Sequence, residues 1–241
     1  MSGSVTAAEV MAVTIARRLV DGETIAVGSV SPIPASACLL ARATHAPHAR
    51  LILLGNADRF PFNGGMQEFY NFAMRGKIDV FFGSGAQIDE HGNFNLSVVG
   101  DYARPRVRLP GGRAQGVLPF VVKRFFLFRT DHSPRVFVPR VDFVTAPGTP
   151  PSGVYRLGGL AAVITDLCVF DFSPERGRLE LASLHPGVTL QDVQARTGFP
   201  LHASSTVAPS PSPSSRELEL LRGSVHEELE NFYPEYVRAH G

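Results

Sequence analysis

An amide and a carboxylate follow the apolar run at residues 51–54, and both side-chain types can take part in hydrogen-bonding or acid–base chemistry. Asn56 stands at the carboxyl end of a predicted buried strand, where its amide could donate a hydrogen bond to a negative charge that develops in a reaction. Turn formation is the alternative role for Asn56. Asp58 is better explained as a solvated loop carboxylate that pairs with Arg59.

The glycine-rich stretch PGGRAQG at residues 110–116 is a second place where chemistry could occur. Because glycine has no side chain, Gly111, Gly112 and Gly116 would let the backbone approach a bound ligand closely. Gln115, in the same stretch, is a candidate for direct contact with substrate. A structural turn would account for the pattern equally well.

The sequence AQIDEHGNFNLS at residues 86–97 predicts a hairpin with its turn at residues 89–92. Gln87 is a candidate to brace or contact a substrate site from this hairpin. Asn93 and Asn95 are candidates for the same bracing, although turn chemistry explains them better.

Cysteines and histidines show no spacing typical of a reactive or metal-binding site. Cys38 and Cys168 lie far apart without a CxxC pattern, which is typical of reduced thiols, and Cys38 lies in an apolar stretch where a thiol is usually a core residue. The eight histidines are scattered. We therefore expect no metal site and no permanently bound cofactor.

These residues are expected to be positioned by alternating helices and strands, which predict a three-layer α/β fold with a mainly parallel sheet flanked by helices. The segments on which this prediction depends are a helix over residues 10–20, a strand over 24–27, a helix over 35–44, a strand over 51–54, a helix over 66–75, a strand over 78–82, further strands within 135–144 and 161–172, and a helix over 189–196.

The length of 241 residues fits one such domain, which we place at residues 1–203. Residues 204–215 are rich in serine and proline and predict an extended linker. Residues 216–241 predict a C-terminal helix that packs on the domain or on a partner.

The formal charge of +1 comes from acidic and basic residues spread along the chain, so no basic stripe favours nucleic acid. No apolar run approaches the roughly 18 residues that a membrane span needs, and the N-terminus lacks the order of an export signal. We expect a cytoplasmic protein with neither a nucleic-acid nor a membrane partner.

Several long motifs, in order along the chain, resemble the β subunit of family I CoA-transferases, of the glutaconate CoA-transferase type. They are IARRLVDGETIAVGS at residues 15–29, LARATHAP at 40–47, RGKIDVFFGSGAQIDEHGNFN at 75–95, VGDYARPRVRLPGG at 99–112, AVITDLCVFDF at 162–172 and LHPGVTLQDVQARTGF at 184–199. The resemblance implies the fold of that superfamily, an α subunit of similar fold in an αβ heterodimer or α2β2 heterotetramer, and an acyl-CoA substrate whose coenzyme A is not a resident cofactor.

The resemblance also places the family's nucleophile in this chain. In the transferases a glutamate near the end of the strand that follows an Ala-Pro turn attacks the thioester carbonyl and then carries CoA as a glutamyl thioester. Counting from Ala46 and Pro47 puts Leu54 at that position, and an alkyl group cannot be a nucleophile. Leu54, Gly55 and Asn56 are then expected to line the acyl-CoA site, with Gln115 and its glycines on another side.

Three functions stay open. The first is an enzyme that acts on an acyl-CoA by hydrolysis, ring opening or decarboxylation, with catalytic groups that could come from the α subunit. The second is true CoA transfer, rescued by a carboxylate of the α chain or by Asp58 or Glu68. The third is a non-catalytic partner that binds acyl-CoA or stabilises the α chain.

Overall fold

The computed structural model describes residues 4–240, and a single eight-stranded sheet organises the chain. The order across the sheet is β12-β11-β10-β9-β8-β3-β1-β2. Only the pairs β9–β10 and β10–β11 are antiparallel. The bounds of the strands are β1 Thr24–Val27, β2 Arg50–Leu53, β3 Val80–Gly83, β8 Arg124–Arg129, β9 Gly159–Thr165, β10 Cys168–Ser173, β11 Arg178–Leu184 and β12 Ala203–Pro209.

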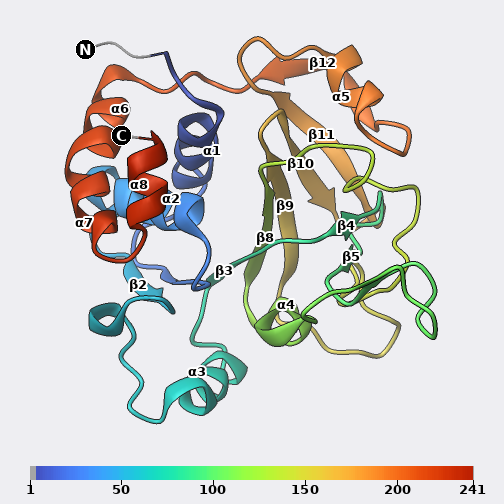
Figure 1. The fold of residues 1–241 in the computed structure, drawn as a ribbon, viewed down its shortest axis with the longest axis horizontal. Helices are drawn as coiled ribbons and strands as arrows, with labels where there is room; N and C mark the ends of the chain where they lie inside the picture. The colour runs from blue at the N-terminus through green and yellow to red at the C-terminus, as the bar shows by residue number, and fades with distance from the viewer. Residues whose placement is uncertain (1–3, 241) are drawn as a thin grey trace.

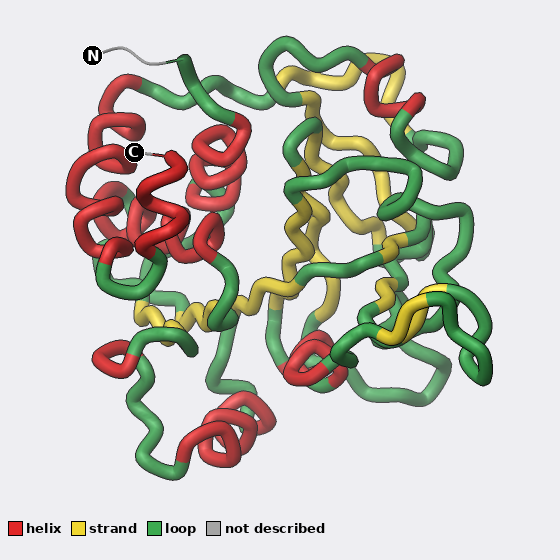
Figure 2. The backbone as a smooth tube through the Cα atoms, in the orientation of Figure 1, coloured by secondary structure: helices red, strands yellow, loops and turns green. Residues whose placement is uncertain are grey.

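Helices and loops cover the two faces, which confirms the predicted three-layer α/β fold (Figure 1). Figure 2 shows helices grouped on one side of the strands and mostly loops on the other. The helices are α1 Ala7–Ala16, α2 Pro32–Thr44, α3 Gly65–Met74, α4 Leu118–Val121, α5 Leu190–Ala195, α6 Ser215–Leu220, α7 His226–Glu230 and α8 Pro234–His240.

Strand β1 shows why both faces are buried. Ile25 and Val27 point into the core beneath α1 and α2, whereas Ala26 points into the second core, which contains Phe69 of α3. This alternation follows from the two-residue period of a strand. The connection from β1 to β2 through α2 and the return from β2 to β3 through α3 run in opposite directions across the sheet, so right-handed crossovers place the two helices on opposite faces. The carboxyl ends of β1, β2, β3 and β8 therefore meet at one edge.

The predicted hairpin is confirmed as β4 Gln87–Ile88 and β5 Phe94–Asn95, which pair antiparallel. A second small ladder joins β6 Val98–Val99 to β7 Val107–Arg108. The predicted strand within residues 135–144 is wrong. That segment forms turns and one bridge at Phe137, because Pro139 interrupts it and the amides of Val136 and Phe137 turn back to Ser133. Strands β8 and β11 were not predicted.

Residues 203–209 form β12, which pairs with β11, so the prediction of a linker is wrong for this part of residues 204–215. Its Ser-Ser-Thr-Val sequence suits a strand once an edge is available for pairing. After it, α6 begins at Ser215 with Ser214 as its N-cap, and the π-helical turn η3 Leu221–Val225 joins α6 to α7. None of the helices among residues 4–240 has both the length and the apolar character needed to cross a membrane.

Candidate functional site

A cavity of about 720 Å³ lies at the edge where the carboxyl ends of the parallel strands meet. Open α/β sheets bind their ligands at this edge, because loops from several neighbouring strands converge there. The loop Gly28–Ser31 comes from β1, Leu54 from β2, Ser84 from β3 and Phe128 from β8. Met66 and Tyr70 of α3 and the stretch at 110–115 close the cavity from the other side.

Leu54 lines this cavity. Its amide donates a hydrogen bond to the carbonyl of Val27 at 3.0 Å, which keeps the chain in register with β1 for one residue beyond β2. No aspartate or glutamate of the described residues lines the cavity, and its titratable lining groups are Tyr70 and Arg113. The described residues that line the cavity therefore provide no carboxylate nucleophile.

Gln115 lines the cavity and holds the loop after β3. Its Oε1 accepts a hydrogen bond from the amide of Ser84 at 2.9 Å. A Cβ at Gly83 would lie 2.5 Å from that oxygen and would overlap the ring of Phe125. A side chain at residue 83 would therefore displace the Phe125 ring or the Gln115 side chain.

Arg113 is the only fully charged side chain that lines the cavity among the described residues. It is also the only non-glycine residue in the described chain with a positive φ, at 46°. This left-handed conformation is costly for a residue with a Cβ and is concentrated at functional sites. Arg113 is exposed and no described carboxylate forms an ion pair with it, so its guanidinium is free to pair with an anion.

Some of the other predicted site residues line the cavity, and the others lie beside it. Gly111 and Gly112 line the cavity, but Gly55 and Gly116 do not. Asn56 is an N-cap: its Oδ1 accepts hydrogen bonds from the amides of Asp58 and Arg59, which begin the short helix η1 Ala57–Arg59. The turn-forming role of Asn56 is the one that the structure shows.

Neither carboxylate that was considered as a substitute nucleophile reaches the cavity. Asp58 is exposed on η1, and Glu68 is exposed on α3, where its Oε2 accepts a hydrogen bond from the amide of Gly64 at 2.9 Å.

Gln87 lies in a buried hydrogen-bond network instead of the cavity. Its Nε2 donates to Asp142 at 2.9 Å, and its Oε1 accepts from Asn95 at 2.7 Å. Asp89 accepts hydrogen bonds from the backbone and side chain of Asn93, which closes the hairpin turn. Gln87 therefore shapes the hairpin and does not line the cavity.

The two thiols and His132 are buried. Burial raises the pKa of both thiols, that of Cys168 to about 12. His132, stacked on Phe137 and bonded to Thr165 and Thr197, has its pKa lowered to about 3 by burial and is neutral. Within residues 4–240 no three histidine, cysteine or acidic side chains are grouped to hold a metal ion.

The loop after β1, with Ser29 and Ser31, and the residues Tyr70, Ser84 and Arg113 line the cavity but were not among the predicted site residues. The sequence held a signal for two of them. Arg113 lies inside the glycine-rich stretch, and Ser29 ends the first of the resembling motifs.

Comparison with known proteins gives one consistent result. A family model described as coenzyme A transferase matches residues 54–196. The chain is 35% identical to the B subunit of the 3-oxoadipate CoA-transferase of Pseudomonas knackmussii, over 89% of this chain and 91% of that protein. It is 30% identical to the B subunit of the glutaconate CoA-transferase of Acidaminococcus fermentans, over 85% and 88%.

Proteins with other activities are similar over the same length. A cholesterol ring-cleaving hydrolase IpdB subunit of Rhodococcus jostii is 31% identical, with 90% of this chain and 91% of that protein covered. The crystal structure of the decarboxylase AibA/AibB matches with a TM-score of 0.76 and 26% identity, over 91% of this chain and 94% of that one.

Proposed function

The chain belongs to the coenzyme A transferase family, and from that premise we propose that it is the B-type partner in a two-chain enzyme whose acyl-CoA thioester binds in the cavity at the carboxyl edge of the sheet. We propose further that the reaction is hydrolysis, ring opening or decarboxylation without a glutamyl-CoA intermediate. The observation that carries this proposal is the cavity lining, which includes Leu54, the residue that the resemblance implies at the nucleophile position, and no described carboxylate. Similar subunits of a hydrolase and a decarboxylase show that the family accommodates such chemistry.

The three reactions share one requirement. Hydrolysis and ring opening pass through an oxyanion when water or hydroxide adds to a carbonyl carbon. Decarboxylation leaves the electron pair of the broken C–C bond on the acyl group as carbon dioxide departs. In each case negative charge develops on the acyl group, and a positively charged side chain held beside it lowers the activation barrier. Arg113 is placed for that role.

The cavity wall offers few groups that could move a proton. Among the described residues, the phenol of Tyr70 is the only titratable lining group besides Arg113. The acid–base groups are therefore assigned to the α-type partner chain, which would complete the site from the open side in an αβ heterodimer or α2β2 heterotetramer. Coenzyme A enters as part of the substrate.

A cytoplasmic location is part of the proposal. Two buried cysteines remain as free thiols, which suits a reducing compartment.

True CoA transfer is the second candidate, favoured by the identity to the 3-oxoadipate and glutaconate transferase subunits. It would require the α-type chain to provide the carboxylate. A non-catalytic chain that only binds acyl-CoA or stabilises its α-type partner is the third candidate.

The products formed from an acyl-CoA separate these functions. The chain is co-expressed with the α-type chain that copurifies with it and incubated with a panel of acyl-CoA esters, with and without an acceptor carboxylate. Free CoA, carbon dioxide and all CoA thioesters are then measured. We expect the acyl-CoA to be consumed without an acceptor, at a rate at least 100-fold above that of either chain alone. Free CoA would mark thioester hydrolysis, a CoA thioester that has gained water would mark ring opening, and carbon dioxide with a shortened acyl-CoA would mark decarboxylation. Formation of the acceptor's own CoA thioester would establish transfer. Equal rates for the pair and for the α-type chain alone would establish that the present chain is non-catalytic.

A further inference from the structure

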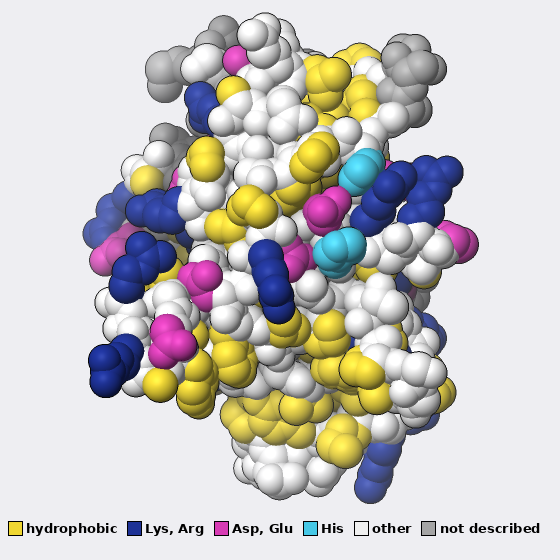
Figure 3. Space-filling model, turned by 90° about the vertical axis from the view of Figure 1, so that its right-hand side faces the viewer, with side chains coloured by type: hydrophobic (Ala, Val, Ile, Leu, Met, Phe, Trp, Pro, Cys, Tyr) yellow, Lys and Arg dark blue, Asp and Glu magenta, His cyan; other side chains and the backbone are white. Residues whose placement is uncertain are grey.

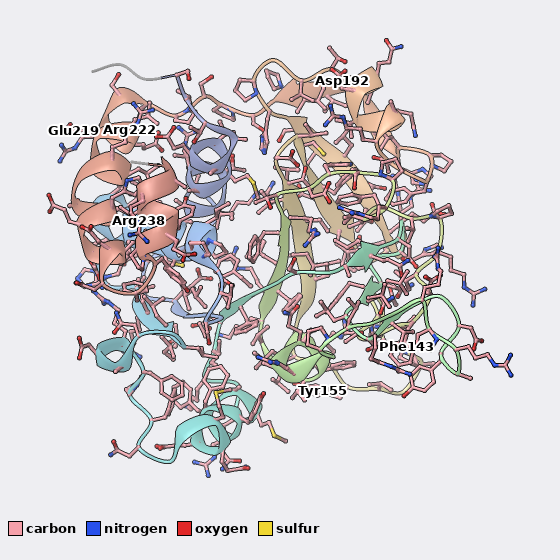
Figure 4. All side chains as sticks on the ribbon, viewed as in Figure 1. Phe143, Tyr155, Asp192, Glu219, Arg222 and Arg238 are labelled. Carbon is pink, nitrogen blue, oxygen red and sulfur yellow. The ribbon has the colours of Figure 1, made fainter. Side chains whose placement is uncertain are left out.

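The C-terminal segment, residues 214–240, is built into the domain and is not an appendage. Leu221, Val225 and Leu229 are buried in the core beneath α1 and α2. Figure 1 shows α6, α7 and α8 stacked on the outer side of α1 and α2, and Figure 4 labels Arg222 on this segment. Arg222 forms an ion pair with Glu9 of α1 at 2.6 Å.

The C-terminal segment contacts the loop that follows β1, which is the first of the loops that line the cavity. The hydroxyl of Tyr233 donates a hydrogen bond to the carbonyl of Gly28 at 3.1 Å and accepts one from the amide of Ser31 at 3.4 Å. One phenol therefore holds both ends of the loop that follows β1. Every residue of that loop, 28–31, lines the cavity. Burial raises the pKa of Tyr233, so the hydroxyl remains protonated and can donate.

The same segment also reaches the second cavity loop. Glu228 of α7 forms an ion pair with Arg59, at the end of η1. That short helix begins three residues after Leu54, and Asn56 caps its first end. The helix η1 is thus held at both ends, by Asn56 at its start and by Glu228 at its last residue.

A second cavity adjoins the first and is lined in part by the C-terminal segment. It holds about 640 Å³ and shares Val30 and Phe128 with the acyl-CoA cavity. Tyr236 and Ala239 of α8 form part of its wall. The C-terminal segment therefore lines a cavity that adjoins the substrate cavity, although none of its described residues lines the substrate cavity itself.

We infer that the C-terminal segment sets the width of the substrate cavity, with Tyr233 and Glu228 as positioning residues for the loops after β1 and β2. Neither residue lines the cavity or reacts with substrate. Both lie outside residues 54–196, the part of the chain that the family model matches. The effect on substrate rests on the proposed function, whereas the effect on the loops does not.

Two conservative substitutions remove the contacts and keep the packing. Tyr233→Phe deletes the hydroxyl but retains the ring against Phe232, and Glu228→Gln deletes the charge. In the full chain with its α-type partner, binding of S-ethyl-coenzyme A, a thioether that cannot be cleaved, is measured by titration. Amide hydrogen exchange is followed in peptides that contain residues 28–33 and 54–60. Each variant is expected to weaken binding about 3- to 10-fold and to speed exchange in its own loop.

Glu217→Gln is the matched control. It breaks an ion pair of the same segment, with Arg17 at 2.7 Å, that contacts neither loop. We expect it to change neither thioether binding nor exchange in the two peptides. The charge swap of Arg59→Glu with Glu228→Arg should restore binding that Glu228→Gln loses.

Two outcomes would overturn the inference. One is unchanged loop exchange in Tyr233→Phe and Glu228→Gln, and the other is an equal effect from Glu217→Gln, which would mean that the segment acts only through overall stability. If the unsubstituted pair does not bind the thioether, the proposed function fails, and the exchange data alone decide whether the segment holds the loops.

Discussion

The hairpin around Gln87 and the cavity around Arg113 differ in how their polar side chains are bonded. The amides of the hairpin and Asp142 bond to one another, whereas the mainly apolar cavity wall includes Arg113, which has no described ion-pair partner. In the hairpin Asn95 is fully buried and bonds to Gln87 and to the amide of Ser97, while Asp142 accepts from Gln87 and from the amide of Gly100. In the cavity the Arg113 guanidinium has no described ion-pair partner and its backbone is left-handed.

This contrast distinguishes side chains that stabilise the fold from side chains that can bind a ligand. A buried group whose hydrogen bonds are complete has nothing left to offer a substrate, and removing it costs stability. A charged side chain on a cavity wall that has no ion-pair partner contributes little to the stability of the fold. It can form an ion pair with a bound anion. On Figure 3, by comparison, Lys and Arg side chains are scattered among acidic, apolar and neutral ones.

The largest effect is expected from Asn95→Ala in the hairpin. The substitution leaves the amide of Ser97 and the buried amide of Val98 without the acceptor that they share and removes a donor to Gln87, so the free energy of unfolding should fall by about 2–3 kcal/mol. Urea unfolding followed by circular dichroism measures it. Asn71→Ala, an exposed amide on α3, should change stability by less than about 0.5 kcal/mol. Equal losses for the two variants would contradict the structural role of the network.

Arg113→Ala is expected to leave stability nearly unchanged and to lower kcat/KM of the two-chain enzyme about 100-fold, because it removes the charge that stabilises the developing anion. Arg113→Lys should recover part of the loss. The control is Arg104→Ala, an exposed arginine that does not line the cavity, for which turnover should stay within twofold. Full activity of the Arg113→Ala enzyme would show that Arg113 has no role in the reaction.

A smaller effect should appear in the pH dependence of stability. The amide of Gly100, and then Gln87, hold the pKa of Asp142 below its ordinary value of 3.8. Because the folded pKa is the lower one, the stabilisation is present above about pH 4 and is lost as pH falls through the folded pKa. Asp142→Asn should be less stable than the unsubstituted chain at pH 6, and the difference should shrink at pH 3. A constant difference would show that the carboxylate charge is not involved.

The sequence was sufficient to predict the parallel core, because apolar strands, glycine stops and helices alternate there with little interruption. The role expected for Leu54 came from the family resemblance. The sequence could not distinguish Gln87 from Gln115. Both are amides next to glycine-rich turns, and only tertiary contacts show that one is enclosed in a network while the other reaches the cavity. The contact of Tyr233 with Gly28 joins opposite ends of the chain, and no local pattern predicts such a pairing. Similarly, Ser-rich residues 203–209 became a strand because β11 offered an edge.

The central claim is that the cavity wall of this chain supplies no carboxylate to carry CoA. The direct measurement is mass spectrometry of both chains after incubation with an acyl-CoA substrate and borohydride reduction, with Leu54→Glu as the variant that places a carboxylate in the cavity. We expect no CoA adduct and no reduced side chain on either unsubstituted chain, and an adduct at residue 54 in the variant. A CoA thioester on an aspartate or glutamate of the unsubstituted chain would contradict the account.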